Sequence, residues 1–112
     1  LLLVAATTSL RLSVYYYPGQ STTDDVNANS SLVIIAFATI NSDGSVSMPA
    51  NYIPCQLIST WQSAGSKVLF SIGGEGASWT SIFASNSSMN TSITSIMGIL
   101  ATTPFNGVDL DL

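Results

Sequence analysis

Strand-like and helix-like segments alternate in the hydrophobic pattern of this chain. Four segments are rich in β-branched, aromatic and other apolar residues and have the length of strands: Leu12–Tyr17, Leu32–Ala38, Val68–Ile72 and Val108–Leu112. The turn pair Pro18-Gly19 stops the first segment, and the polar run Asn41–Ser45 follows the second as a loop. The second segment is apolar throughout instead of alternating, which indicates a parallel strand buried on both faces.

Apolar residues at helical spacing predict helices between the later strands. Leu57, Ile58 and Trp61 form one stripe of a helix that runs from Pro54 to about Ala64. A short helical stretch is expected near Trp79 to Ala84. A longer helix, which Pro104 ends, carries an apolar face of Met89, Ile93, Ile96, Met97 and Leu100.

The order of these segments predicts an α/β fold. It is strand, strand, helix, strand, helix, strand, with a long loop in place of a clear first helix. Alternation of this kind is typical of parallel strands joined by right-handed crossovers. The spacing suits either an open doubly wound sheet or part of an eight-stranded barrel, and it does not choose between them.

The composition excludes several classes of function. Only 7% of the 112 residues are charged and 46% are apolar, so we expect the chain to fold. The net charge of −4, with Arg11 and Lys67 as the two basic residues, excludes nucleic-acid binding through a basic surface. The absence of His and the single Cys55 exclude zinc fingers, disulfide scaffolds and His-based triads within this sequence. Cys55 has apolar neighbours, which favours a buried structural thiol.

Two features favour secretion to the extracellular space. Leu1–Ala6 resembles the end of a secretory hydrophobic region followed by small residues, although a first buried strand would show the same pattern. Three Asn-x-Ser/Thr triplets, at Asn29, Asn86 and Asn90, are candidate glycosylation sites. No apolar run reaches the roughly 18 residues that a membrane span requires.

The glycine-rich segment Gly73-Gly74-Glu75-Gly76 follows a predicted strand, where a phosphate cradle is possible. It lacks the third glycine of the dinucleotide fingerprint, and no Gly-Lys-Ser/Thr follows it. The carboxylate in this loop would also repel phosphate. The remaining interpretations are a tight turn and a place where a neutral ligand approaches bare backbone.

Asp109 and Asp111 are the strongest candidates for chemistry. In a strand they project to one face, while Val108, Leu110 and Leu112 project to the other. Two neighbouring carboxylates on a buried strand are costly, because the charges repel each other and lose water. A metal site or a paired acid–base apparatus for glycosidic chemistry would explain the pattern, and so would an exposed edge strand with a polar face.

These motifs resemble the two signatures of the family 18 glycoside hydrolases, the chitinases and their relatives. Ser71-Ile72-Gly73-Gly74 is similar to the family's Ser-x-Gly-Gly at the end of barrel strand three. Asn106–Leu112 is similar to Asp-Gly-x-Asp-x-Asp-x-Glu on strand four, with Asn106 where many members have Asp and others Asn. Tyr15–Gln20 and Ile35–Ala38 are similar to the family's first two strands, so the resemblance runs from about Leu12 to Leu112.

The resemblance implies that this is the N-terminal half, about four strands, of a (β/α)₈ TIM barrel. Residues 11–112 would be part of a catalytic domain, and residues 1–10 the remnant of a secretory signal or an N-terminal lead-in. A complete barrel takes about 250 residues. The sequence ends at Leu112, one position before the family's catalytic Glu, so we expect this fragment to be inactive by itself.

The resemblance also implies an activity for the full-length protein. A chitinase of this family cleaves β-1,4-linked N-acetylglucosamine polymers by substrate-assisted retaining catalysis, in which the substrate's own acetamido carbonyl attacks the anomeric carbon. By this implication Asp111 orients and polarises the acetamido group, and Asp109 sits behind it and shares a proton. No cofactor or metal is implied, and the partners are chitin or N-acetylglucosamine oligosaccharides.

The substrate-binding residues are implied in the same way. Tyr17 and Phe37, placed at the C-terminal ends of their strands, would form the floor under the sugar, which Ser71, Gly73 and Gly74 would shape. The alternatives within the family are a carbohydrate-binding, lectin-like homologue without activity and an endo-β-N-acetylglucosaminidase. The alternative from another class is a small α/β domain, complete at this length, that binds a divalent metal through the two aspartates.

Overall fold

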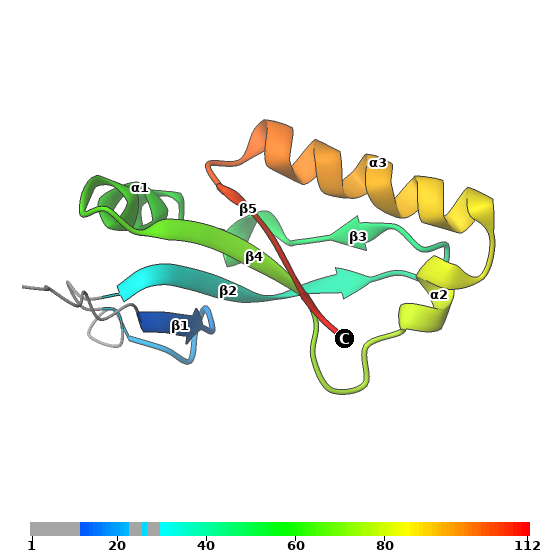
Figure 1. Cartoon of the computed structure of the whole chain (residues 1–112), viewed down its shortest axis with the longest axis horizontal. Helices are drawn as coiled ribbons and strands as arrows, with labels where there is room; N and C mark the ends of the chain where they lie inside the picture. Colours follow the sequence, from blue (N-terminus) through cyan, green and yellow to red (C-terminus); the bar gives the residue numbers. More distant parts are fainter. Residues whose placement is uncertain (1–11, 23–25, 27–29) are drawn as a thin grey trace, which may run out of the picture.

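The structure, a computed structural model, describes residues 12–22, 26 and 30–112. The segment 1–10 expected to be a leader, Arg11 and the candidate glycosylation site Asn29 lie outside the described residues. Four strands form one parallel sheet in the order β1-β2-β4-β5 (Figure 1). Their bounds are Leu12–Tyr16 for β1, Ser30–Ile40 for β2, Lys67–Gly73 for β4 and Gly107–Asp111 for β5.

Helices connect these strands. The helix α1 (Cys55–Ser63) joins β2 to β4, and α2 (Trp79–Phe83) and α3 (Asn86–Thr102) join β4 to β5. In Figure 1, α1 and α3 lie above the sheet while α2 lies beside its right-hand end. The sequence-based expectation of an α/β fold with four parallel strands is therefore confirmed. None of the helices in the described part of the chain is both long and apolar enough to cross a membrane.

The core lies between the helices and one face of the sheet. Alternate residues of the paired strands point toward the helices, beginning with Tyr16 opposite Ile35 and Ile35 opposite Phe70. Tyr16 packs edge-on against Trp61 of α1, with ring centroids 5.1 Å apart. The fully buried apolar residues of this core are Val33, Ile35, Ile58, Val68, Phe70 and Ile72.

Local sequence signals set the helix ends. Ser85 and Ser88 form a reciprocal capping box at the start of α3, because each side chain accepts a hydrogen bond from the other's backbone N–H, at 3.0 and 2.9 Å. Helix α1 ends at a left-handed Gly65, whose N–H donates to the carbonyl of Gln62. Helix α1 thus lies close to the bounds expected from the sequence, and α3 ends at Thr102, shortly before Pro104, as expected.

Three details differ from the sequence-based expectations. The second strand continues to Ile40, and the chain then turns back as a short hairpin with β3 (Val46–Ser47). The sequence did not predict this hairpin, because only two residue pairs form it and so short a strand leaves little hydrophobic pattern. The 3₁₀ turn Ala50–Tyr52 precedes α1. The expectation of a buried Cys55 was wrong: α1 buries the face of Ile58 and Trp61, and the thiol of its first residue is exposed.

A bulge interrupts the pairing of β2 with β4. Ile35 pairs with Phe70 and Ala38 with Ile72, so Ala36 and Phe37 together stand opposite Ser71. The peptide bond between these two residues is cis. A bulge redirects a side chain locally, and bulges are frequent beside active sites. Phe37 therefore lies at a bulge one residue before the parallel pairing of β2 with β4 ends at Ala38, while the strand itself continues to Ile40.

Apolar side chains remain exposed on the outer side of α3 and β5. Ile93 and Met97 lie one turn apart on α3, each with 59% of its surface accessible. Leu110 and Leu112 are exposed on and after β5, which is an edge of the sheet. An open parallel edge beside apolar side chains favours association with another chain.

We therefore expect the isolated 112-residue polypeptide to associate in solution. With 7% charged residues, little repulsion opposes contact between the exposed surfaces of two copies. Size-exclusion chromatography with light scattering should show oligomers or aggregates, and the double variant Ile93→Gln, Met97→Gln should shift the distribution toward monomer. A wild-type monomer with a sharp cooperative melt would contradict the expectation.

Candidate active site

The candidate site lies where the parallel strands end, on the face of the sheet opposite the helices. Strand pairing places Ser71 opposite Asp109 and Gly73 opposite Asp111. Because side chains alternate along a strand, these residues share one face, and the core residues Phe70 and Ile72 occupy the other. The two aspartates expected to act together are thus brought to one face, near the C-terminal end of the sheet.

Asp109 is held by two neutral hydroxyl groups. The Oγ of Ser71 donates a hydrogen bond to Oδ2 of Asp109 at 2.7 Å, and the phenol of Tyr15 donates to the same oxygen at 3.2 Å. Ser71 is fully buried, and no buried side-chain donor or acceptor in the described residues lacks a partner. These hydroxyl donors orient the carboxylate without placing a cation beside it.

The surroundings of Tyr15 raise the pKa of its phenol. Burial of the phenol, followed by the charge of Asp109 and the hydrogen bond to it, raises the pKa of Tyr15 above its ordinary value of about 10. The sequence analysis singled out Tyr17 and not Tyr15. The alternation of β1 could have found it, because Tyr16 is buried against the helices and its neighbour must face the aspartates.

Three aromatic rings gather beside the carboxylates. Tyr15, Tyr17 and Phe37 lie with ring centroids 5.9 to 6.5 Å apart, and Tyr15 and Tyr17 are nearly parallel. The bulge in β2 brings Phe37 into this group, and Tyr17 follows β1 directly. Clustered rings offer an apolar surface of the kind that binds the faces of sugar rings. We call these three residues the aromatic cluster.

The glycine pair fixes how closely the neighbouring chain can approach. Gly73 has φ of +130°, and a Cβ placed there would overlap the carbonyl oxygen of Asp111. Gly74 has φ of +85°, and a Cβ there would come within 2.9 Å of the Phe37 ring. Both positions thus combine a left-handed backbone with a close contact. The Asp111 backbone therefore lies directly against Gly73, and the Phe37 ring lies directly against Gly74.

Trp79 contributes a contact that the sequence analysis missed. Its indole Nε1 donates a hydrogen bond to the backbone oxygen of Asp111 at 3.2 Å, and its ring stacks on Phe83 at 6.2 Å. The sequence predicts only that Trp79 belongs to a short helix, because no motif around it indicates a contact with β5. The bond ties the start of α2 to the end of β5.

Asn106, the first residue of the aspartate motif, lies at the opposite end of the strands. Its side-chain oxygen accepts from the N–H of Val68 at 2.8 Å and from Nε2 of Gln62 at 3.0 Å, and its own N–H donates to the Val68 carbonyl. This residue stabilises the entry to β5. At the N-terminal end of a parallel sheet such a residue contributes to stability and does not touch substrate.

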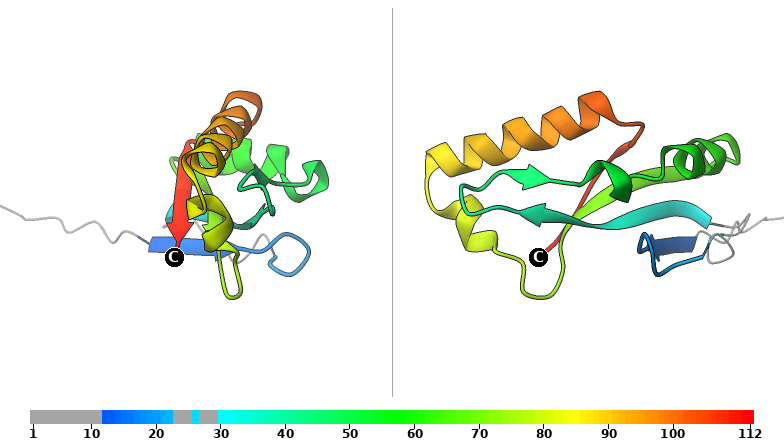
Figure 2. Two further views of the ribbon diagram at one scale, coloured as in Figure 1. Left: turned by 90° about the vertical axis from the view of Figure 1, so that its right-hand side faces the viewer. Right: turned by 180° about the vertical axis from the view of Figure 1, so that it is seen from behind.

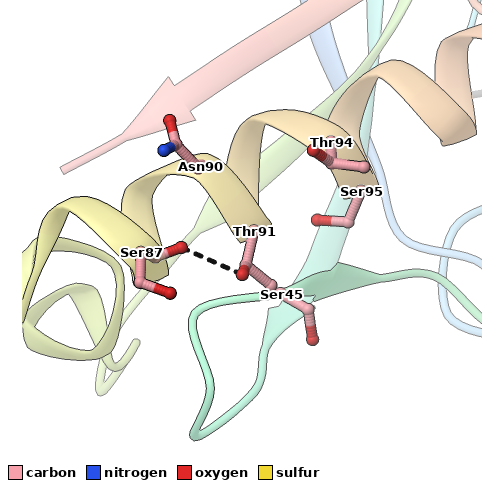
Figure 3. Close-up of a pocket in the computed structure, with 6 residues that line it drawn as sticks. All are labelled: Ser45, Ser87, Asn90, Thr91, Thr94 and Ser95. Atoms are coloured by element: carbon pink, nitrogen blue, oxygen red, sulfur yellow. Dashed lines mark hydrogen bonds between the residues drawn. The ribbon is translucent and has the colours of Figure 1, made fainter.

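The described residues offer neither a metal-binding cluster nor, in a second pocket beside α3, a titratable group. The described residues contain no group of three or more His, Cys, Asp or Glu side chains that could hold a metal ion. A pocket between α3 and the turn after β2 is lined by hydroxyl and amide side chains without a titratable group (Figure 3). Its lining residues are Ser45, Ser87, Asn90, Thr91, Thr94 and Ser95. It offers no acid or base.

The remaining candidate residues of the sequence analysis lie away from the aspartates. Asn86 begins α3 and Asn90 follows one turn later, both with exposed side chains. Both views of Figure 2 show α3 at the top of the molecule and the C-terminus, which follows β5, well below it. A glycan on either asparagine would therefore leave the strand ends open.

Comparison with known proteins identifies the family. Residues 12–112 match the glycosyl hydrolases family 18, and the chain belongs to this family. A search of the curated proteins gave no match.

Solved structures of the family share the fold. A chitinase from Rhizomucor miehei has a TM-score of 0.72 at 21% identity, covering 88% of this chain and 32% of that one. A family 18 N-acetylglucosaminidase from Paenibacillus barengoltzii has a TM-score of 0.74 at 14% identity, covering 93% and 31%. An immunomodulatory active chitinase from Trichuris suis has a TM-score of 0.71 at 24% identity, covering 93% and 33%.

The chain spans about a third of the length of these structures. The four parallel strands correspond to part of a TIM barrel, as the sequence predicted. The interpretation as an independent small metal-binding domain is replaced by membership of this glycosidase family.

The contact at Gly73 yields a stability prediction. In a polypeptide that completes the barrel, Gly76→Ala should cost about 1 kcal/mol, because its φ is +78° but nothing lies within 4 Å of the new Cβ. Gly73→Ala should cost a further 1–3 kcal/mol, roughly the cost of overpacking, because the Asp111 backbone must move. Urea unfolding measures both variants, and equal losses would contradict the close approach.

The phenol of Tyr15 yields a prediction about pH. Its raised pKa means that the folded state holds the proton more tightly, so this stabilising contribution is present below about pH 10 and declines as pH rises through the folded-state pKa. Asp109→Asn should lower the Tyr15 pKa toward its ordinary value, because the charge is removed. The pH dependence of tyrosinate absorbance measures the pKa of Tyr15. The variant Tyr15→Phe shows which absorbance step belongs to this residue, and Asp43→Asn controls for the loss of one negative charge elsewhere. If the Tyr15 absorbance step stayed at the same pH in Asp109→Asn, the contact between Tyr15 and Asp109 would be contradicted.

Proposed function

We propose that this chain forms the first half of the barrel of a chitinase that cleaves β-1,4-linked N-acetylglucosamine polymers. The observation that carries the proposal is the position of Asp109 and Asp111 on one face at the strand ends, beside the aromatic cluster. The family match over residues 12–112 supports a substrate of the chitin type. The remaining strands of the barrel belong to a longer protein in this proposal.

The proposed reaction is substrate-assisted hydrolysis with retention. A glutamate directly after Leu112 protonates the glycosidic oxygen, and the acetamido oxygen of the substrate attacks the anomeric carbon as the bond to the leaving group breaks. Asp111 orients the acetamido group and stabilises the positive charge that develops on it. Water then opens the cyclic intermediate, the glutamate takes the water's proton, and the acetamido group is restored.

Asp109 acts in this proposal as a positioning residue for Asp111. Its Oδ2 is already occupied by the hydroxyl groups of Ser71 and Tyr15, which hold the carboxylate in place. Asp109 lies behind Asp111 and shares a proton with it in this proposal, so that the two neighbouring carboxylates do not repel each other. The arrangement needs no cofactor, because the acid, the nucleophile and the stabilising charge come from side chains and from the substrate.

The aromatic cluster forms the floor of the sugar site. Tyr17 and Phe37 present rings to the apolar faces of the pyranose units, while Ser71, Gly73 and Gly74 leave the backbone open for close approach. Binding of the neighbouring units supplies the energy that holds the reacting unit in place. Truncating these rings should therefore weaken catalysis as well as binding.

A carbohydrate-binding protein without hydrolytic activity is the second candidate. The aromatic cluster and the glycine pair favour it equally, because sugar binding needs rings and open backbone but no acid. The residue that follows Leu112 in the complete protein separates the two candidates. Glutamate there supports the hydrolase, and glutamine, leucine or another residue supports the binding protein.

We further propose that the complete protein is secreted. The apolar segment Leu1–Ala6 and the triplets at Asn29, Asn86 and Asn90 support it. Asn86 and Asn90 are exposed on α3, so glycans there would not disturb the packing of the sheet.

The role of Asp111 gives the decisive test of the activity. In the complete protein, Asp111→Asn keeps the side chain's shape but removes its charge, which is needed chiefly when positive charge develops on the acetamido group. We expect kcat on chitin oligosaccharides to fall by about 10²–10³, with a much smaller change in KM. Steady-state kinetics with a chromogenic N-acetylglucosamine oligomer measures both parameters.

Two controls accompany this measurement. The wild type should hydrolyse substrates without the acetamido group slowly, and Asp111→Asn should reduce kcat on these substrates only slightly further. Asp43→Asn removes the same charge in the remote hairpin turn and should leave kcat unchanged. An unchanged kcat in Asp111→Asn would rule out the proposed role, and loss of wild-type activity with a chelator, restored by a divalent ion, would support a metal site instead.

A further inference from the structure

A small pocket adjoins the candidate site where β2 and β4 end. It has a volume of about 280 Å³, near the lower limit of about 300 Å³ for small-molecule pockets, which suits one sugar unit and not a chain. The end of β2 forms one wall and the loop after β4 forms the other. Its lining residues are Phe37, Ala38, Thr39, Ile40, Gly73, Glu75, Gly76, Ala77 and Ser78.

Phe37 connects this pocket with the aromatic cluster. Its ring belongs to the cluster through Tyr15 and Tyr17, and the same residue lines the pocket. Gly74 lies directly against the ring, where a Cβ would come within 2.9 Å. A sugar chain that crosses the cluster can therefore place a neighbouring unit in the pocket.

Glu75 is the single charged residue among those that line the pocket. The other charged groups near the strand ends are Asp109 and Asp111, which are also negative. Lys67, the one basic residue in the described part of the chain, begins β4 at the opposite end of that strand. The described strand ends thus carry negative charge without a neighbouring cation.

We infer that this pocket selects a positively charged sugar unit, namely a glucosamine whose amino group is free. The inference rests on the proposed function. A neutral N-acetylated unit can donate to the Glu75 carboxylate only from an uncharged N–H or O–H group, whereas an ammonium group also places a positive charge beside that carboxylate. The preferred substrate is then a partly deacetylated chitin chain, with an acetylated unit at Asp111 and a deacetylated unit in the pocket.

The two positions have opposite requirements, which makes the preference specific. The reacting unit must keep its acetamido group, because that group supplies the attacking oxygen. The unit in the pocket gains from losing it, because the exposed amine is then free to contact Glu75. Fully deacetylated chains bind the pocket but carry no nucleophile, so the inference predicts that they inhibit and are not cleaved.

The test compares Glu75→Gln with the wild-type complete protein on two oligomers of equal length. One oligomer is fully acetylated and the other carries glucosamine at defined positions. Because Glu75 is exposed, we expect the ratio of kcat/KM for the deacetylated over the acetylated oligomer to fall about two- to fivefold in the variant. At about 1 M salt, where the screening length is about 3 Å, the wild-type preference should disappear.

The matched control is Asp43→Asn, which removes one negative charge from the hairpin turn after β2, at a residue that does not line the pocket. The ratio should stay at the wild-type value in this variant. An equal fall in both variants would show that only net charge matters and would overturn the inference. An unchanged ratio in Glu75→Gln would overturn it as well.

Binding measurements separate this inference from the proposed function. If the complete protein cleaves neither oligomer, the proposed hydrolase activity fails, and calorimetry with a glucosamine tetramer then tests the pocket directly. Weaker binding to Glu75→Gln than to the wild type, with Asp43→Asn unchanged, supports the pocket. Equal binding to all three proteins overturns it.

Discussion

The site depends on the close approach of β4 and β5 at Gly73. Only a hydrogen atom fits between the Cα of Gly73 and the Asp111 backbone, and this contact lets the last strand pair in register up to its end. The register in turn sets Asp109 opposite Ser71, so one glycine determines the positions of both carboxylates. Every other feature of the site is arranged around this pair of strands.

The carboxylates are stabilised without a nearby cation among the described residues. Asp109 receives its hydrogen bonds from two hydroxyl groups, and the chain as a whole has only two basic residues. In the proposed reaction, a lysine or arginine beside Asp109 would neutralise charge that a cationic transition state requires. Neutral donors orient the carboxylate and leave its field intact, which is the more useful arrangement for stabilising developing positive charge.

Much of the fold could be predicted from the sequence, because buried parallel strands are continuous apolar runs. Leu32–Ala38 and Val68–Ile72 are such runs, and the aspartates on β5 follow from alternation. The bulge at Phe37 could not be predicted, since one extra residue in a long apolar strand leaves no mark in the hydrophobic pattern. The hydrogen bond from Trp79 to the backbone oxygen of Asp111 could not be predicted either, because it joins residues 32 positions apart in the sequence.

Asn106 shows why one position in a shared motif can accept two residue types. Both of its side-chain partners, the Val68 amide and the Gln62 side chain, are donors. The position therefore requires an acceptor oxygen. Aspartate and asparagine offer the same oxygen at the same distance from the backbone. Exchange between them keeps an acceptor for both donors at the entry to β5, far from the end of the strands where Asp109 and Asp111 lie.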